Sequence, residues 1–165
     1  MAATTTALAT TNSTHGVSMG RSDRMKPYVV EQRFDFSNQN IDANGSTIEI
    51  CAIPADHLMY YANLEVLTAL TSDQTDGTVD MGLAGGDADY WIDGFDIDGA
   101  SAGDYATMDD ATADHPLLVT ADGSLKLTFA GTGSSITAGV IRVFAVVMPI
   151  KSILKADEVD RDQLA

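Results

Sequence analysis

Aspartates are the most crowded groups in the chain that could do chemistry. Within residues 87–98 there are five of them: Asp87, Asp89, Asp93, Asp96 and Asp98. Carboxylates at this density could hold Ca²⁺, which takes about six to eight oxygen ligands. The pattern of a calcium-binding loop starts correctly at Asp96, but Ala100 and Thr107 stand where later ligands belong. We therefore interpret these aspartates as turn residues on a solvated edge and predict no metal site.

Nucleophiles and bases do not form a recognisable catalytic set. Cys51 lies in the apolar segment IEICAI, where a cysteine usually acts as a small buried hydrophobe. No two of the three histidines are spaced to share a site, and all three fall in the N-terminal segment or in expected loops: His15, His57 and His115. The segment from Gly131 begins like a dinucleotide-binding motif but lacks its third glycine. We predict no catalytic residue and no cofactor.

Aromatic side chains offer one alternative chemistry, the stacking of sugars. Two adjacent pairs stand out, Tyr60-Tyr61 and Tyr90-Trp91. A lone tryptophan on an alternating strand belongs more often to a core or a subunit interface than to a sugar platform. A carbohydrate-binding module therefore remains an alternative to the function predicted below.

The elements that must position these groups are β-strands. Apolar and polar residues alternate over 28–36, 47–52, 78–83 and 124–129, which is the period of a half-buried strand. The segment 139–148 is apolar on both faces except for Arg142, which predicts a central strand or one covered by a partner. A helical turn is expected at 87–95 and a short surface helix at 151–164.

Turn residues separate these strands. Asn-Gly and Asp-Gly steps favour tight turns because glycine takes a positive φ without strain. Such steps between the strands include Asn44-Gly45, Asp76-Gly77, Asp98-Gly99 and Asp122-Gly123. The step at Asp122 separates LLVTA from LKLTF and predicts a hairpin. About eight strands without a long helix indicate an all-β fold, a jelly-roll-like antiparallel β-sandwich over residues 28–150.

Two further segments flank this body, an extended N-terminal arm at 1–27 and a C-terminal tail at 151–165. The arm is rich in Thr, Ala, Ser, Asn and Gly, with too few large apolar groups to fold alone. It therefore needs a partner if it is to be ordered. With four bases against two acids, residues 1–34 are mildly basic, which favours contact with something acidic, such as a neighbouring copy.

Charge and hydropathy argue against several classes of protein. The chain holds 24 acids against nine bases, a net charge of −15, which disfavours binding to nucleic acid or to anionic membranes. The longest apolar run, Val143–Ile150, is far shorter than the ~20 residues of a membrane helix. The first twenty residues lack the basic start and apolar stretch of a secretory signal. One cysteine excludes a disulfide within the chain.

The order of four sequence blocks resembles a known group of proteins. The blocks are ICAIPADHL, YANLEVLTAL, TVDMGLAGGDADYWIDGFDIDGASAGDYA and ADGSLKLTFAGTGSSITAGVIRVFAVVM. Over residues 28–150 they resemble small virion structural proteins of tailed bacteriophages, of the capsid decoration or cement type. The resemblance implies an all-β body, often trimeric, on the outside of an icosahedral shell.

The predicted function is accordingly structural. We expect a decoration protein that binds the major capsid protein and copies of itself, as a homotrimer, on the outer surface of the phage head. The arm would staple subunits together against the pressure of the packaged DNA. The predicted interface residues are Arg21, Arg24, Lys26, Arg142, Val143, Phe144, Val146 and Met148. Besides the carbohydrate-binding module, a tail or fibre-base component remains an alternative.

Overall fold

The computed structural model describes residues 26–38, 41–42, 45–73, 75–108, 116–132 and 135–150. These residues form nine strands and one short 3₁₀ helix, η1 (Phe36–Asn38). The strands are β1 (Tyr28–Asp35), β2 (Ile41–Asp42), β3 (Thr47–Ile53), β4 (His57–Ser72), β5 (Thr75–Leu83), β6 (Ile92–Asp96), β7 (Leu117–Val119), β8 (Gly123–Thr132) and β9 (Ser135–Pro149). Among the described residues, no helix is long and apolar enough to cross a membrane.

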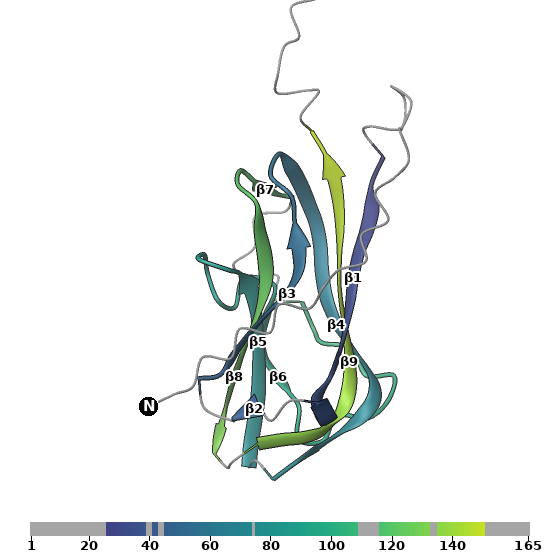
Figure 1. The fold of residues 1–165 in the computed structure, drawn as a ribbon, viewed down its shortest axis with the longest axis vertical. Helices are drawn as coiled ribbons and strands as arrows, with labels where there is room; N and C mark the ends of the chain where they lie inside the picture. The colour runs from purple at the N-terminus through teal and green to yellow at the C-terminus, as the bar shows by residue number, and fades with distance from the viewer. Residues whose placement is uncertain are drawn as a thin grey trace, which may run out of the picture.

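The strands form two antiparallel sheets that face each other. One sheet has the order β1-β9-β4-β7, with β2 also paired to β9, and its strands β1, β9 and β4 lie on the right in Figure 1. The other has the order β3-β8-β5-β6 and lies on the left. The two long strands, β4 and β9, pair along most of their length and form the centre of the first sheet.

The strand pairing is that of a jelly roll. Leaving out β2, the first strand pairs with the last, β1 with β9, and the second with the second to last, β3 with β8. The third pairs with the sixth, β4 with β7, and the fourth with the fifth, β5 with β6. The chain is thus one long hairpin rolled into two four-stranded layers, with β2 as an addition. The predicted fold class, a jelly-roll-like antiparallel sandwich, is confirmed.

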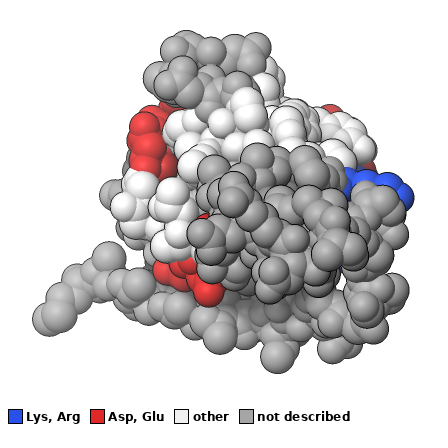
Figure 2. All heavy atoms as spheres, turned by 90° about the horizontal axis from the view of Figure 1, so that it is seen from above, with Lys and Arg blue, Asp and Glu red and all other residues white. Residues whose placement is uncertain are grey.

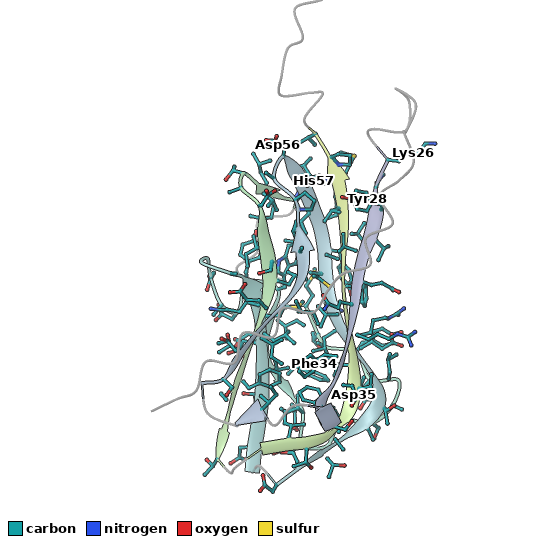
Figure 3. All side chains as sticks on the ribbon, in the orientation of Figure 1. Lys26, Tyr28, Phe34, Asp35, Asp56 and His57 are labelled. Atoms are coloured by element: carbon teal, nitrogen blue, oxygen red, sulfur yellow. The ribbon has the colours of Figure 1, made fainter. Side chains whose placement is uncertain are left out.

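The core lies between the two sheets and follows the predicted alternation. The inward side chains of β9 are almost completely buried: Ile141, Val143, Ala145 and Val147. Leu125, Leu127 and Phe129 of β8 face them from the other sheet, and Phe34 of β1 points between the layers (Figure 3). Burying one such large side chain contributes about 1.5–3 kcal/mol relative to leaving it exposed. The prediction that 139–148 forms a central strand is correct.

A bulge in β3 changes the alternation that the sequence predicts there. Ile48 and Ile50 face the core as expected, but the register shifts between Ile50 and Ala52. Cys51 has a φ of 56°, and its side chain is buried while Ala52 is exposed. The extra residue turns Ile53 back into the core, as a β-bulge does. Strict alternation had put Ala52 inside, and that assignment is wrong, whereas the expectation that Cys51 is buried is confirmed.

Three local predictions, two of them from turn chemistry, are also wrong. Asp122-Gly123 does not close a hairpin, because β7 pairs with β4 in one sheet whereas β8 belongs to the other. Asp76, with a φ of 61°, lies inside β5 beside a register shift rather than between strands. Residues 87–95 do not form a helical turn: bends lead from Ala88 to Trp91, and β6 begins at Ile92.

The predicted arm and tail lie almost entirely outside the residues that the structure describes. Of the arm at 1–27 only Lys26 and Pro27 belong to the described residues, and the tail at 151–165 lies wholly outside them. The helix expected at 151–164 lies outside them as well. These three assignments stay predictions. What the structure adds is the place from which both segments depart, because β1 begins and β9 ends at the upper end of the sandwich (Figure 1).

Candidate functional site

Exposed apolar side chains gather on one surface, the outer face of the sheet that contains β9. Among the described residues, four large hydrophobic side chains are exposed: Val29, Tyr60, Tyr105 and Leu118. Strand pairing places Val29, Tyr105 and Leu118 on this outer face, and a contact with Met148 places Tyr60 there. We name this surface the β9 face; it consists of Val29, Leu58, Tyr60, Tyr61, Tyr105, Leu118, Phe144, Val146 and Met148.

An aromatic cluster forms the centre of the β9 face. The ring centroids of Tyr61 and Phe144 lie 5.9 Å apart, and the Arg142 guanidinium lies 5.2 Å from the Phe144 centroid. Both are favourable ring interactions. Tyr60 is placed outward by a bulge in β4, and its hydroxyl donates to Met148 Sδ at 3.7 Å. The cluster therefore presents ring surface together with a cation.

A buried asparagine holds this cluster in place. Asn63 is 3% exposed, and its Nδ2 donates to the Tyr61 hydroxyl and, at 3.1 Å, to the carbonyl of Ala106. Leaving a buried amide unpaired would cost about 1–3 kcal/mol, so these bonds fix the tyrosine orientation. The β9 face is thus a preorganised surface rather than a set of loose side chains.

Ion pairs border the aromatic cluster. Arg142 lies 2.5 Å from Glu65 and 3.4 Å from Glu31, on the strands to either side of β9. The Tyr105 hydroxyl donates to the other oxygen of Glu65 at 2.8 Å, and this bond raises the pKa of Tyr105. Arg33 stands directly across from Arg142 on β1, so two cations share one row of the sheet.

The β9 face contains three apolar residues of the predicted interface and one cation beside them. Phe144, Val146 and Met148 alternate outward along β9, with Arg142 in the same row. Val143 does not belong to this surface, because its side chain points inward and is 0% exposed. The assignment of Val143 to the interface is wrong, because a continuous apolar run does not reveal which of its alternating side chains face the core.

The remaining predicted interface residues lie in or near the arm. Lys26 lies at the upper end of the molecule, near the start of β1 (Figure 3), while Arg21 and Arg24 lie outside the described residues. Sequence reasoning missed Val29, Tyr105 and Leu118. Only Val29 could have been found from the sequence, because it is an apolar residue among the otherwise charged, outward-facing positions of β1.

The upper end of the molecule holds a tyrosine–histidine pair. The Tyr28 hydroxyl lies 2.9 Å from His57 Nε2, and His57 Nδ1 lies 2.8 Å from the Ala55 carbonyl. Partial burial raises the pKa of Tyr28. The pair joins the start of β1 to the start of β4, close to Asp56 (Figure 3). Seen along the long axis, the described part of this end is largely uncharged (Figure 2). We therefore assign this histidine a structural role.

Within residues 87–98, Asp96 and Asp98 accept hydrogen bonds from backbone amides. Asp98 accepts a hydrogen bond from the backbone of Gly77 at 2.7 Å, and Asp96 accepts one from Asp98 at 3.0 Å. Such contacts are typical of aspartate in loops. In the described ranges no group of three or more His, Cys, Asp or Glu is arranged to hold a metal ion.

The four aromatic residues considered for sugar stacking do not share a surface. Trp91 is 0% exposed and packs in the core next to β5, with Tyr90 against its ring at 5.1 Å between centroids. Tyr60 and Tyr61 lie on the β9 face, on the other sheet. The four residues therefore cannot form one sugar-stacking platform, and only the tyrosines of β4 remain candidates for stacking on a sugar.

Comparison with solved structures finds the same fold in a chain of a phage capsid. A chain of the cyanophage Pam1 capsid asymmetric unit superposes with a TM-score of 0.55 at 18% identity, covering 87% of this chain and 99% of that one. A chain of the acidic stable capsid of Helicobacter pylori bacteriophage KHP30 gives 0.42 at 20% identity, covering 73% and 86%. No family model and no curated protein matches the sequence. At this identity the first likeness establishes a shared fold.

Proposed function

We propose that this protein is a structural component of a bacteriophage virion, of the capsid decoration type. The observation that carries the proposal is the similarity to a Pam1 capsid chain, which extends over 99% of that chain and 87% of this one. The neighbour is thus a protein of nearly the same extent, with no large additional domain. The resemblance of four sequence blocks to decoration proteins supports the same role independently.

The proposed partners are the major capsid protein and further copies of this chain, arranged as a homotrimer. A symmetric shell repeats each contact many times, so that modest single contacts yield strong overall binding. The preorganised β9 face supplies apolar surface for subunit contacts. The arm at 1–27 would order on docking and connect neighbouring subunits on the outer surface of the head.

Binding to heads tests this proposal directly. Heads of the phage whose genome encodes the chain are prepared without it, and the purified full-length protein is added in increasing amounts before sedimentation. We expect saturable binding to intact heads, a bound protein that antibodies reach from outside, and heads that withstand higher temperature before releasing DNA. Protein found on isolated tails but not on heads would instead support the tail or fibre-base alternative.

Deleting residues 1–27 tests the role of the arm. This deletion leaves all nine described strands intact. The shortened protein should therefore remain folded but bind heads much more weakly, because the ordering contacts of the arm are lost. Binding is measured in the same sedimentation assay. Undiminished binding would contradict the staple role while leaving the decoration role in place.

One observation favours a second candidate, a carbohydrate-binding function. Tyr60 and Tyr61 lie side by side on the β9 face, with Phe144 packed against Tyr61. Aromatic rings on a sheet surface can stack on sugars. A glycan array with the full-length protein distinguishes the two functions, because a decoration protein without this activity binds no glycan saturably.

A further inference from the structure

We propose that the β9 face binds a second copy of this chain, and that Arg33 forms an ion pair with a carboxylate of that copy. This inference rests on the self-association included in the proposed function, and it assigns the surface and the charge that carry it. Neither the fold nor the likeness to capsid chains specifies which face meets another copy.

The first argument is the segregation of apolar surface. All four exposed large hydrophobic side chains of the described residues lie on the β9 face. On a monomer such residues are normally scattered singly, whereas a contiguous group marks an interaction site. Aromatic and methionine side chains, present here as Tyr60, Tyr61, Phe144 and Met148, are also enriched at protein–protein interfaces.

The second argument is a cation without an ion-pair partner among the described residues. Arg33 is exposed and lies directly across from Arg142, an arrangement of like charges that destabilises neighbouring strands. Arg142 already contacts both nearby glutamates, Glu31 and Glu65. Within the described part of the chain, no acidic group pairs with Arg33. A carboxylate brought in by another molecule would satisfy this guanidinium and relieve the repulsion.

The third argument identifies the occupant by charge. Residues 35–150 hold eighteen acids but only two bases, Lys126 and Arg142, so the surface of a second copy is strongly acidic. Two such bodies repel each other over most orientations. On the outer face of this sheet, Arg142 neutralises two glutamates, Glu31 and Glu65. With Arg33 left without a described ion-pair partner beside apolar side chains, the β9 face approaches an acidic copy with less repulsion than the rest of the acidic body does. The complementarity therefore favours a copy of this chain over a basic partner.

Reversing the charge at Arg33 tests the inference. Sedimentation velocity is run on full-length wild-type protein and on Arg33→Glu over a range of concentrations. We expect the wild type to associate beyond its 17.4 kDa monomer, and the variant to associate about tenfold more weakly or worse, as for a charge pair lost from an interface. The variant should fold, because the new carboxylate would lie opposite Arg142.

Three further variants distinguish an effect at the β9 face from a general effect of added negative charge. Val29→Asp places a charge within the β9 face and should weaken association as well. Lys126→Glu changes the net charge as much as Arg33→Glu does, and Ala52→Asp matches Val29→Asp, but both of these lie on the other sheet. We expect both controls to associate like the wild type. Equal weakening by the controls would show general repulsion and overturn the inference.

The outcomes also distinguish this inference from the proposed function. A wild-type protein that stays monomeric at every concentration overturns the β9 face as a self-association surface, whatever the head-binding result. Self-association that is lost only in the face variants supports the inference, even if the protein binds no heads. In that case the decoration role alone fails.

Discussion

At the scale of single residues, Cys51 shows how position determines reactivity. Its backbone amide donates to Gln32 Oε1 at 3.0 Å, and its Sγ donates to the Val143 carbonyl at 3.3 Å. Burial, with a smaller contribution from the charge of Glu31, raises the pKa of the thiol to about 12. The thiolate is the reactive form, so this cysteine is protected twice, by exclusion of reagent and by protonation.

We therefore expect Cys51 to resist a thiol reagent such as DTNB in the folded protein. With a pKa of about 12, on the order of one thiol in ten thousand is ionised at pH 8. Full reaction of one thiol per chain should appear only after unfolding in guanidinium chloride. The measurement is absorbance of the released thionitrobenzoate with time. Rapid reaction of the native protein would show that β3 opens locally or that the thiol is accessible.

At the scale of elements, the bulges of β4 depend on a glycine in its neighbour β9. Gly139 has a φ of 115°, and a Cβ there would lie 2.5 Å from Leu70 Cδ2 and 2.9 Å from the Ala69 carbonyl oxygen. The register between β4 and β9 shifts at this point, so the two strands approach closely without a side chain between them. This glycine allows two strands of such length to stay paired while they curve.

Gly139→Ala should lower the free energy of unfolding by about 2–4 kcal/mol, from backbone strain and overlap combined. For a domain of this size that corresponds to roughly 5–15 °C in thermal midpoint. Gly99→Ala is the matched control, because a Cβ at Gly99 meets nothing within 4 Å. The control should shift the midpoint by less than about 2 °C. Equal midpoints for the two variants would contradict the close approach inferred here.

The elements also show what the sequence could and could not predict. Alternation correctly predicted the inward faces of β1 and β8 and the central position of β9, since burial on one face imposes a period of two. It failed at Ala52, because Cys51 takes a positive φ and shifts the register. The turn expected at Asp76 lies inside β5 for the same reason. The hairpin predicted at Asp122 was wrong for another reason: turn chemistry does not reveal whether two strands enter the same sheet. The β9 face was predicted only in part, since Tyr105 and Leu118 come from separate segments that meet only in the fold.

At the scale of the whole molecule, the jelly-roll pairing makes the ends of the described chain indispensable. β1 pairs with β9 over eight residue pairs, from Tyr28 with Val147 to Asp35 with Val140. Phe34 and Phe36 carry aromatic packing from this end into the core, with centroids 4.9 Å apart. Losing β1 would expose the edge of β9 and the inner aromatic layer together.

Deleting residues 1–35 should therefore abolish cooperative folding, whereas deleting 1–27 should preserve it. The two truncations differ by only eight residues, but those residues are the whole of β1. Near-ultraviolet circular dichroism and a thermal melt are the measurements. A sharp melt of the shorter protein would show that the sheet of β4 and β9 is stable without its edge strand.

The same pairing has a mechanical consequence. Because β1 begins and β9 ends side by side, with Tyr28 across from Val147, a force pulling residues 26 and 150 apart acts on neighbouring antiparallel strands. Their hydrogen bonds would break one pair at a time, as in unzipping, rather than share the force in shear. A body held by both chain ends would thus yield at low tension, while the long pairing of β4 with β9 is spared. On a surface under outward pressure, such a molecule would bear force better through its sheet face than between its two ends.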